Sequence, residues 1–219
     1  MKSTLAQRIV AEGLGTAFLL AAVVGSGIMA AKLAGGNGAL ALLCNTLPTG
    51  AILTVLILML GPISGAHFNP AVSIAMALRG ALGVRPTLIY VAAQVIGGIL
   101  GVWAAHLMFA LPMWQVASTV RAGPGQWLAE AIATFGLLLT IFGCSARTPG
   151  AVPYAAGLYI TAAYWFTAST SFANPAVTIA RSLSDTFAGI APGGVMAFIG
   201  AQLVGMLMAV VLGGWLWRN

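Results

Sequence analysis

The triplet Asn-Pro-Ala occurs twice, once in each half of the chain, as Asn69, Pro70 and Ala71 and again as Asn174, Pro175 and Ala176. Asn is a favoured N-cap and Pro a favoured first helical residue, so each triplet predicts the start of a helix. The Asn amide can donate a hydrogen bond to an oxygen atom, and a helix start carries the positive end of the helix dipole. Each triplet therefore combines a hydrogen-bond donor with a positive helix end.

Composition places these triplets in a membrane. Hydrophobic residues make up 60% of the chain, charged residues 5%, and the mean hydropathy is +1.02. A soluble domain of this size cannot bury so much apolar surface. The apolar stretches are long enough for helical spans of about 20 residues and lack the alternation of a membrane barrel. The sequence therefore predicts an all-α protein surrounded by a lipid bilayer.

Six apolar stretches are predicted to cross the membrane as helices, at 8–31, 38–60, 87–109, 127–146, 151–168 and 194–216. Two further apolar pieces, 69–79 and 174–183, are too short to cross, and each begins with Asn-Pro. We predict that these two pieces are re-entrant half-helices.

Three sequence blocks recur in the same order in the two halves of the chain. AEGLGT at 11–16 matches AEAIAT at 129–134, NPAVSIA at 69–75 matches NPAVTIA at 174–180, and LIYVAAQVIGG at 88–98 matches MAFIGAQLVGM at 196–206. The repeats, about 1–110 and 120–219, each hold three spans, and an odd number of spans inverts the second repeat. We predict a single transmembrane domain over 1–219 with an inverted 3+3 repeat, whose two half-helices meet near the membrane centre.

The net charge of +6 is explained by orientation in the membrane. With six spans, one side carries the larger set of basic residues, namely Lys2, Arg8, Arg79, Arg85, Arg147 and Arg218. The opposite side carries Lys32 and Arg121. The positive-inside rule then predicts that both termini are cytoplasmic, and basic anchoring of this kind requires no nucleic-acid partner.

Together these residues resemble the aquaporin and glycerol-facilitator family over essentially the whole chain. The resemblance rests on SGAHFNPAV at 64–72, NPAV at 174–177, the matched Glu12 and Glu130, the matched glutamines, and the inverted repeat. It implies a passive channel for water and small neutral solutes, without cofactor or metal, that assembles as a homotetramer with one pore per subunit. In such channels the two Asn side chains orient permeating molecules, and the facing helix ends oppose cations.

The resemblance also implies roles for residues around the triplets. Glu12 and Glu130 are expected to accept hydrogen bonds from the loops before the half-helices and so to brace them. His67 lines the cytoplasmic vestibule in the family, and a structural interface histidine is the alternative. The paired Gln94 and Gln202 are interpreted as helix-packing positions.

The selectivity filter departs from the family pattern. Members normally carry Arg directly after the second triplet, whereas this chain has Val177. The family spacing places Thr49 where water-selective members have a bulky aromatic residue. The fifth-span position is Tyr164 by helix register or Ala162 by counting back from the triplet, and Ser171 is the loop contribution.

Two further residues bear on the width of this filter. Phe172 stands just before the second triplet and can narrow the opening. Arg181 lies one helical turn after Val177, where it either overhangs the outer vestibule or serves as an anchor or a partner of Asp185. Thr49 and Val177 together predict a filter wider than that of a strict water channel.

The predicted function is therefore a passive channel, in a bacterial inner membrane, for water and small neutral solutes such as glycerol-like polyols or arsenous acid. A strict water channel stays open as an alternative. A secondary transporter also uses inverted repeats and broken helices, but would need a coupling-ion site. An enzyme is disfavoured, because the sequence offers no nucleophile–base pair, metal cluster or cofactor motif.

Overall fold

The computed structural model describes residues 3–217, and every regular element within that range is helical. Five helices are long and apolar enough to cross a membrane: α1 (Leu5–Leu33), α2 (Gly38–Ser64), α4 (Val84–Met108), α5 (Pro124–Arg147) and α8 (Pro192–Leu216). The remaining predicted span is the shorter α6 (Val152–Phe166), preceded by the 3-10 turn η1 (Pro149–Ala151). Lys2 and Arg218, which enter the charge argument, lie outside the described residues.

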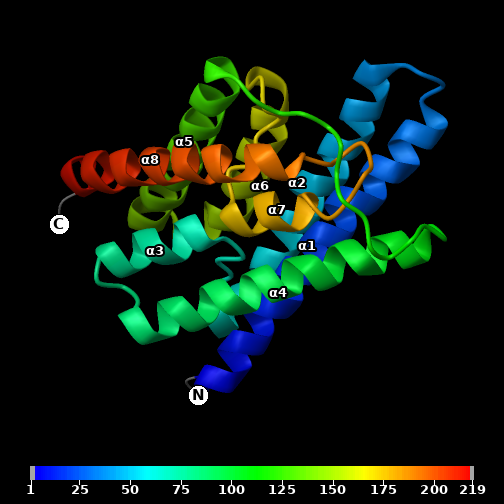
Figure 1. Cartoon of the computed structure of the whole chain (residues 1–219). Coiled ribbons are helices and arrows are strands. Elements are labelled where there is room, and N and C mark those ends of the chain that lie inside the picture. Colours follow the sequence, from blue (N-terminus) through cyan, green and yellow to red (C-terminus); the bar gives the residue numbers. More distant parts are fainter. Residues whose placement is uncertain (1–2, 218–219) are drawn as a thin grey trace.

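The two short segments form half-helices, α3 (Pro70–Leu78) and α7 (Pro175–Arg181); α3 lies between α4 and α8, and α7 lies toward the middle of the bundle (Figure 1). Asn69 and Asn174 are their N-caps, with extended backbone φ angles of −153° and −160°. Each Asn side chain accepts a hydrogen bond from the backbone two residues later at 2.9 Å. The proline that follows each cap needs no N–H partner, so the sequence Asn-Pro fits a helix start inside the membrane.

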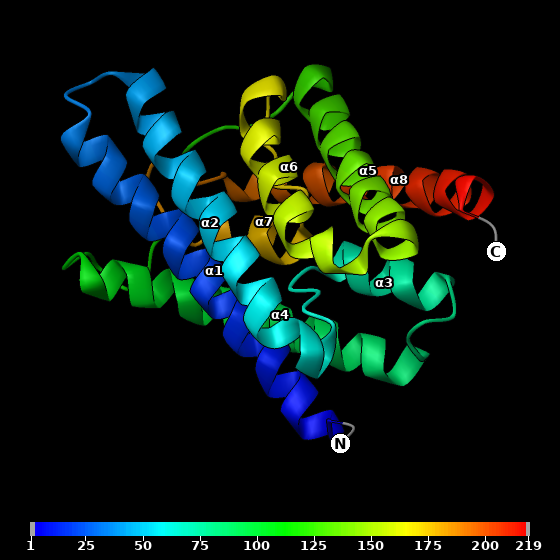
Figure 2. The same cartoon turned by 180° about the vertical axis from the view of Figure 1, so that it is seen from behind.

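The packing of the two halves follows one pattern. In the first half α1 packs against α2 and α4, and in the second half α5 packs against α6 and α8. The halves join where α2 meets α6 and where each half-helix contacts both α4 and α8, as the view from behind shows for α2 and α6 (Figure 2). The predicted all-α fold with six membrane helices and two re-entrant half-helices is confirmed.

Small residues allow the long helices to approach closely. A Cβ atom added at Gly101 would lie 2.1 Å from the carbonyl oxygen of Ala17, and one added at Gly205 would lie 2.1 Å from that of Ala131. Helices in lipid gain little from hydrophobic burial against each other, so van der Waals contact between backbones holds them together. The α1–α4 and α5–α8 pairs therefore depend on these glycines.

We predict that Gly101→Ala destabilises the fold, because the new methyl group meets a backbone atom that cannot rotate away. The expected loss is about 1–3 kcal/mol, measured as a lower unfolding temperature of the purified protein in detergent. Gly200→Ala is the matched control, because a Cβ atom there meets nothing within 4 Å on the same type of helix. Equal unfolding temperatures for the two variants would contradict this explanation of the packing.

Candidate functional site

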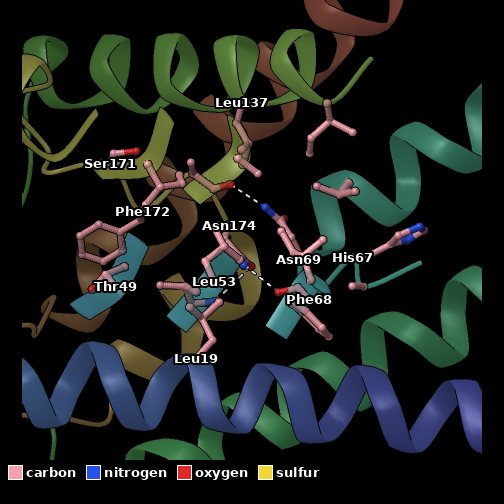
Figure 3. A pocket seen from close by; sticks show the side chains of 18 of the residues that line it. Leu19, Thr49, Leu53, His67, Phe68, Asn69, Leu137, Ser171, Phe172 and Asn174 are labelled. Atoms are coloured by element: carbon pink, nitrogen blue, oxygen red, sulfur yellow. Dashed lines mark hydrogen bonds between the residues drawn. The ribbon is translucent and has the colours of Figure 1, made fainter. Parts of the chain in front are cut away.

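The two triplets hold each other across the centre of the bundle. The side-chain amide of Asn69 donates to the carbonyl oxygen of Ala173 at 2.8 Å, and that of Asn174 donates to the carbonyl oxygen of Phe68 at 2.8 Å (Figure 3). A side-chain amide carries two N–H groups, so each Asn keeps a second donor. Both Asn side chains line a cavity.

The loops before the half-helices have an unusual backbone. Ala66 and Phe68 in the first loop, and Ser171 and Ala173 in the second, have φ angles of 50°, 50°, 49° and 49°. Residues with a side chain rarely adopt this left-handed conformation, which costs about 1–3 kcal/mol for each residue. Something in the surroundings must therefore hold these loops in place.

In the first half the fully buried carboxylate of Glu12 holds the loop. It accepts hydrogen bonds from the backbone N–H of His67 at 2.9 Å and of Phe68 at 2.7 Å. It also accepts from the Ser64 hydroxyl at 2.6 Å and from the Gln94 amide at 2.8 Å. Hydrogen bonds to a charged acceptor are stronger than neutral ones, which offsets the strain of the loop.

In the second half Glu130 repeats the arrangement donor for donor. Its buried carboxylate accepts from the backbone N–H of Phe172 at 2.8 Å and of Ala173 at 2.9 Å. The Ser169 hydroxyl donates to it at 2.6 Å and the Gln202 amide at 2.6 Å. Each loop is thus fixed by one carboxylate that binds two backbone N–H groups, one serine and one glutamine.

The cavity runs past both triplets and contains most of the residues expected at the pore. Its lining includes Thr49, His67, Asn69, Tyr164, Ser171, Phe172, Asn174, Val177 and Arg181. Thr49, Ser171 and Phe172 lie on one side of the two asparagines and His67 on the other (Figure 3). The rest of the wall is largely apolar, so a few polar groups stand along a hydrophobic passage. Pro70, Ala71, Pro175 and Ala176 are buried in the half-helix starts rather than in the lining.

The structure resolves the two readings of the fifth-span position. Tyr164 is buried in the cavity lining, and its hydroxyl oxygen lies 3.5 Å from that of Thr49. Ala162 is exposed and lies outside the lining. Residues two positions apart on an α-helix point in nearly opposite directions, so only one of the two can face the cavity. Of the two candidates, the residue given by helix register therefore lines the cavity, and the residue given by counting back from the triplet does not.

Arg181 also takes one of its two expected positions. It is 2% exposed and lines the cavity, with its guanidinium carbon 3.4 Å from the centroid of the Phe172 ring. Asp185, the alternative partner, is exposed on the surface and accepts hydrogen bonds from the backbone N–H and hydroxyl of Ser118. The Ser118 backbone hydrogen bond, followed by the hydroxyl, holds the pKa of Asp185 below its usual value. Arg181 therefore belongs to the cavity and not to a surface pair.

His67 lies toward the other end of the cavity, beside α3. Its Nδ1 atom is 3.0 Å from the hydroxyl of Ser73, and its ring packs edge-on against Tyr90 with centroids 5.5 Å apart. The Ser73 hydroxyl also accepts from Gln94 at 2.9 Å, which links His67 to the group around Glu12. His67 thus lines the cavity and is also held in place by its contacts with Ser73 and Tyr90.

Comparison with known proteins assigns the chain to a family. Residues 1–152 match the sequence pattern of the family described as Major intrinsic protein. The chain is 57% identical to Aquaglyceroporin AqpS of Rhizobium meliloti (strain 1021), over 97% of this chain and 91% of that protein. The chain belongs to the major intrinsic protein family, that of the aquaporins and glycerol facilitators. The resemblance read from the sequence is confirmed.

Similarity to more distant members of the major intrinsic protein family supports this assignment. The chain is 32% identical to Probable aquaporin AqpM of Archaeoglobus fulgidus, over 100% of this chain and 98% of that protein. Among solved structures, that of the aquaglyceroporin from Plasmodium falciparum superposes with a TM-score of 0.75 and 21% identity, over 98% of this chain and 96% of that one, and shows the shared fold. Members of this family are passive channels and not enzymes, and the chain is accordingly an integral membrane channel protein.

Sequence reasoning missed part of the support around this family's triplets. The sequence patterns predict no role for Ser64 and Ser169 and a packing role for Gln94 and Gln202, whereas all four donate to the bracing carboxylates. A signal was present, because each serine precedes its triplet by the same number of residues and the glutamines match between the repeats. Buried polar side chains at matched positions indicate a shared hydrogen-bond partner.

We predict that Glu130→Gln destabilises the second loop, because an amide presents N–H groups toward donors that need an acceptor. The expected loss is about 2–3 kcal/mol in thermal unfolding, together with reduced water permeability in liposomes. Glu12→Gln should behave alike, since its partners are equivalent. Asp185→Asn is the control, because its retained oxygen can keep both hydrogen bonds at an exposed site. If Glu130→Gln unfolds and conducts like the wild type, the carboxylate does not brace the loop.

Proposed function

We propose that this channel conducts water and small neutral solutes through a selectivity filter that is widened by the absence of arginine after the second triplet. The observation that carries the proposal is Val177, a short apolar side chain in the cavity lining at the position where the family has arginine. Thr49, Tyr164 and Ser171 complete the filter in this proposal. Thr49 is small, and its hydroxyl donates to its own helix at the Asn45 carbonyl.

Asn69 and Asn174 carry the central step of permeation. A solute oxygen accepts from the free N–H of each amide while its carbon atoms slide along the apolar wall. The starts of α3 and α7 direct their positive dipole ends toward the same point, which opposes the passage of cations. Glu12 and Glu130 act indirectly, because they hold the loops that position the asparagines.

Small neutral polyhydroxy molecules fit this combination of groups. Glycerol-like polyols and uncharged arsenous acid carry no charge, offer oxygen atoms to the asparagine amides, and can donate a hydroxyl hydrogen to the Thr49 oxygen. The related AqpS is described as an aquaglyceroporin, which supports this solute class. His67 would meet the same solutes at the inner vestibule.

A strict water channel is the second candidate, because Phe172 and Tyr164 place two aromatic rings in the cavity lining and can take back the width left by Val177. A secondary transporter has less support. Its coupling ion would need a free ionisable group at the centre, whereas Glu12 and Glu130 are buried and each accepts four hydrogen bonds.

The assembly and orientation follow from the same proposal. We propose one channel domain over 1–219 with inverted repeats of about 1–110 and 120–219, both termini in the cytoplasm, and a homotetramer in a bacterial inner membrane. The distribution of basic residues supports the orientation, and the bacterial origin of the related AqpS supports the membrane.

Val177→Arg tests the widened filter. We expect it to lower glycerol and arsenous acid uptake into liposomes by roughly tenfold or more while water efflux continues, because the long side chain blocks larger solutes first. Stopped-flow light scattering on the purified protein measures both fluxes, and Val177→Ile is the control for a change of size without charge. If the wild type passes water alone, the solute assignment is wrong and the aromatic rings close the mouth.

A further inference from the structure

Arg181 carries a buried positive charge that the pathway described above does not use. The chain has three acidic residues, and the hydrogen bonds of each carboxylate go to other groups. Glu12 and Glu130 bind the two loops, and Asp185 binds Ser118. A buried charge without a carboxylate partner is costly, so such a group is retained where its charge serves a purpose.

One edge of the Arg181 guanidinium is held in place. Its Nε atom donates to the carbonyl oxygen of Ala188, and its plane lies over the face of the Phe172 ring. A cation over an aromatic face is favourably placed. Nη1 is buried and has no hydrogen-bond partner within residues 3–217. The unpaired donor therefore belongs to a side chain that is fixed and lines the cavity.

The helix geometry explains how this side chain reaches the filter. Long side chains on an α-helix lean toward the helix start, and Arg181 is one turn after Val177 on the same face of α7. Its contact with Phe172, which precedes α7, shows that the guanidinium extends back along the half-helix. In the first repeat Val72 and Met76 occupy the matching positions of α3, and both line the cavity. Positions one turn apart on both half-helices therefore face the passage.

A second unpaired polar group belongs to the same cavity lining as the arginine. The Ser171 hydroxyl is buried and without a partner in the described part of the chain, and Ser171 lines the same cavity directly before Phe172. A second guanidinium, that of Arg121, lies 5.2 Å from the Phe172 ring centroid and donates to the Gly189 carbonyl at 2.9 Å. Two guanidinium groups thus lie over one aromatic ring, and the residue just before that ring carries the free hydroxyl.

We propose that Arg181 is a displaced filter arginine, which binds the oxygen atoms of entering neutral solutes through Nη1, together with the Ser171 hydroxyl, and excludes cations. The proposal rests on the solute channel proposed above and names the residue that selects its solutes. Val177 leaves the usual place open, and the arginine enters from one turn further along α7. The opening is wider than with arginine at 177, but its charge and donor are kept.

Arg181→Met tests the proposal and gives α7 the residue that α3 has at the matching position. The variant, the wild type and the exposed-arginine control Arg85→Met are reconstituted in liposomes. Three fluxes are measured: water, sodium, and the protein-dependent uptake of glycerol and 1,2-propanediol. The two solutes share a carbon skeleton and differ by one hydroxyl group, so their ratio reports recognition of oxygen and not width. Thermal unfolding and size-exclusion profiles check that each variant is folded.

In Arg181→Met we expect sodium influx to rise roughly tenfold, as removal of one nearby unit charge from a partly desolvated passage implies. The glycerol to propanediol ratio should fall several-fold, while Arg85→Met behaves like the wild type. Arg181→Lys keeps the charge but not the planar set of donors, so it should exclude sodium and still lose part of the solute ratio. This second variant carries the test if Arg181→Met does not fold.

Unchanged sodium influx and an unchanged solute ratio in folded Arg181→Met would overturn the proposal. Failure of the channel assignment looks different, because the wild type itself would then admit neither glycerol nor propanediol above protein-free liposomes. In that case the sodium and water fluxes of the Arg181 variants still decide whether the arginine excludes cations from the cavity.

Discussion

The pore depends on one interaction, the binding of backbone N–H groups by a buried carboxylate. Backbone inside a membrane must find its hydrogen bonds within the protein, and the loops before the half-helices have no helix to supply them. Glu12 and Glu130 supply the acceptors, at 2.7–2.9 Å from two successive N–H groups in each loop. The left-handed backbone that results directs each loop so that Asn69 and Asn174 meet across the centre.

The inverted repeat explains why the residues that brace the loops are the same in both halves, whereas the residues that line the cavity differ. The bracing groups are the same in both halves, because each half must solve the same backbone problem. The cavity lining is not the same: His67 in the first loop stands where the second has Phe172, and Met76 on α3 stands where α7 has Arg181. The symmetric residues hold the two helix starts in place, and the asymmetric ones give each end of the passage its own chemistry.

The membrane spans and the starts of the two half-helices are predictable from the sequence, because the constraints that set them act locally. Membrane thickness sets the length of the spans, and Asn followed by Pro at the start of an apolar segment favours a helix start there. The bracing serines were not recognised, since their partner lies on another helix and only the comparison of the two repeats points to it. Helix register and counting along the chain point to different residues, Tyr164 and Ala162, because the loop between them and the triplet is shorter than usual, and the structure places Tyr164 in the cavity lining.

Sequence reasoning left two positions open for Arg181 for a related reason. Its guanidinium is fixed by the Ala188 carbonyl and the Phe172 ring, which come together only when the chain after α7 folds back toward the loop before it. A half-helix presents residues one turn apart to the same passage, so a charge can move along it without disturbing the helix start or its dipole. The selectivity of such a channel can therefore change through side chains on α7 while the carboxylates, the caps and the crossed loops remain as they are.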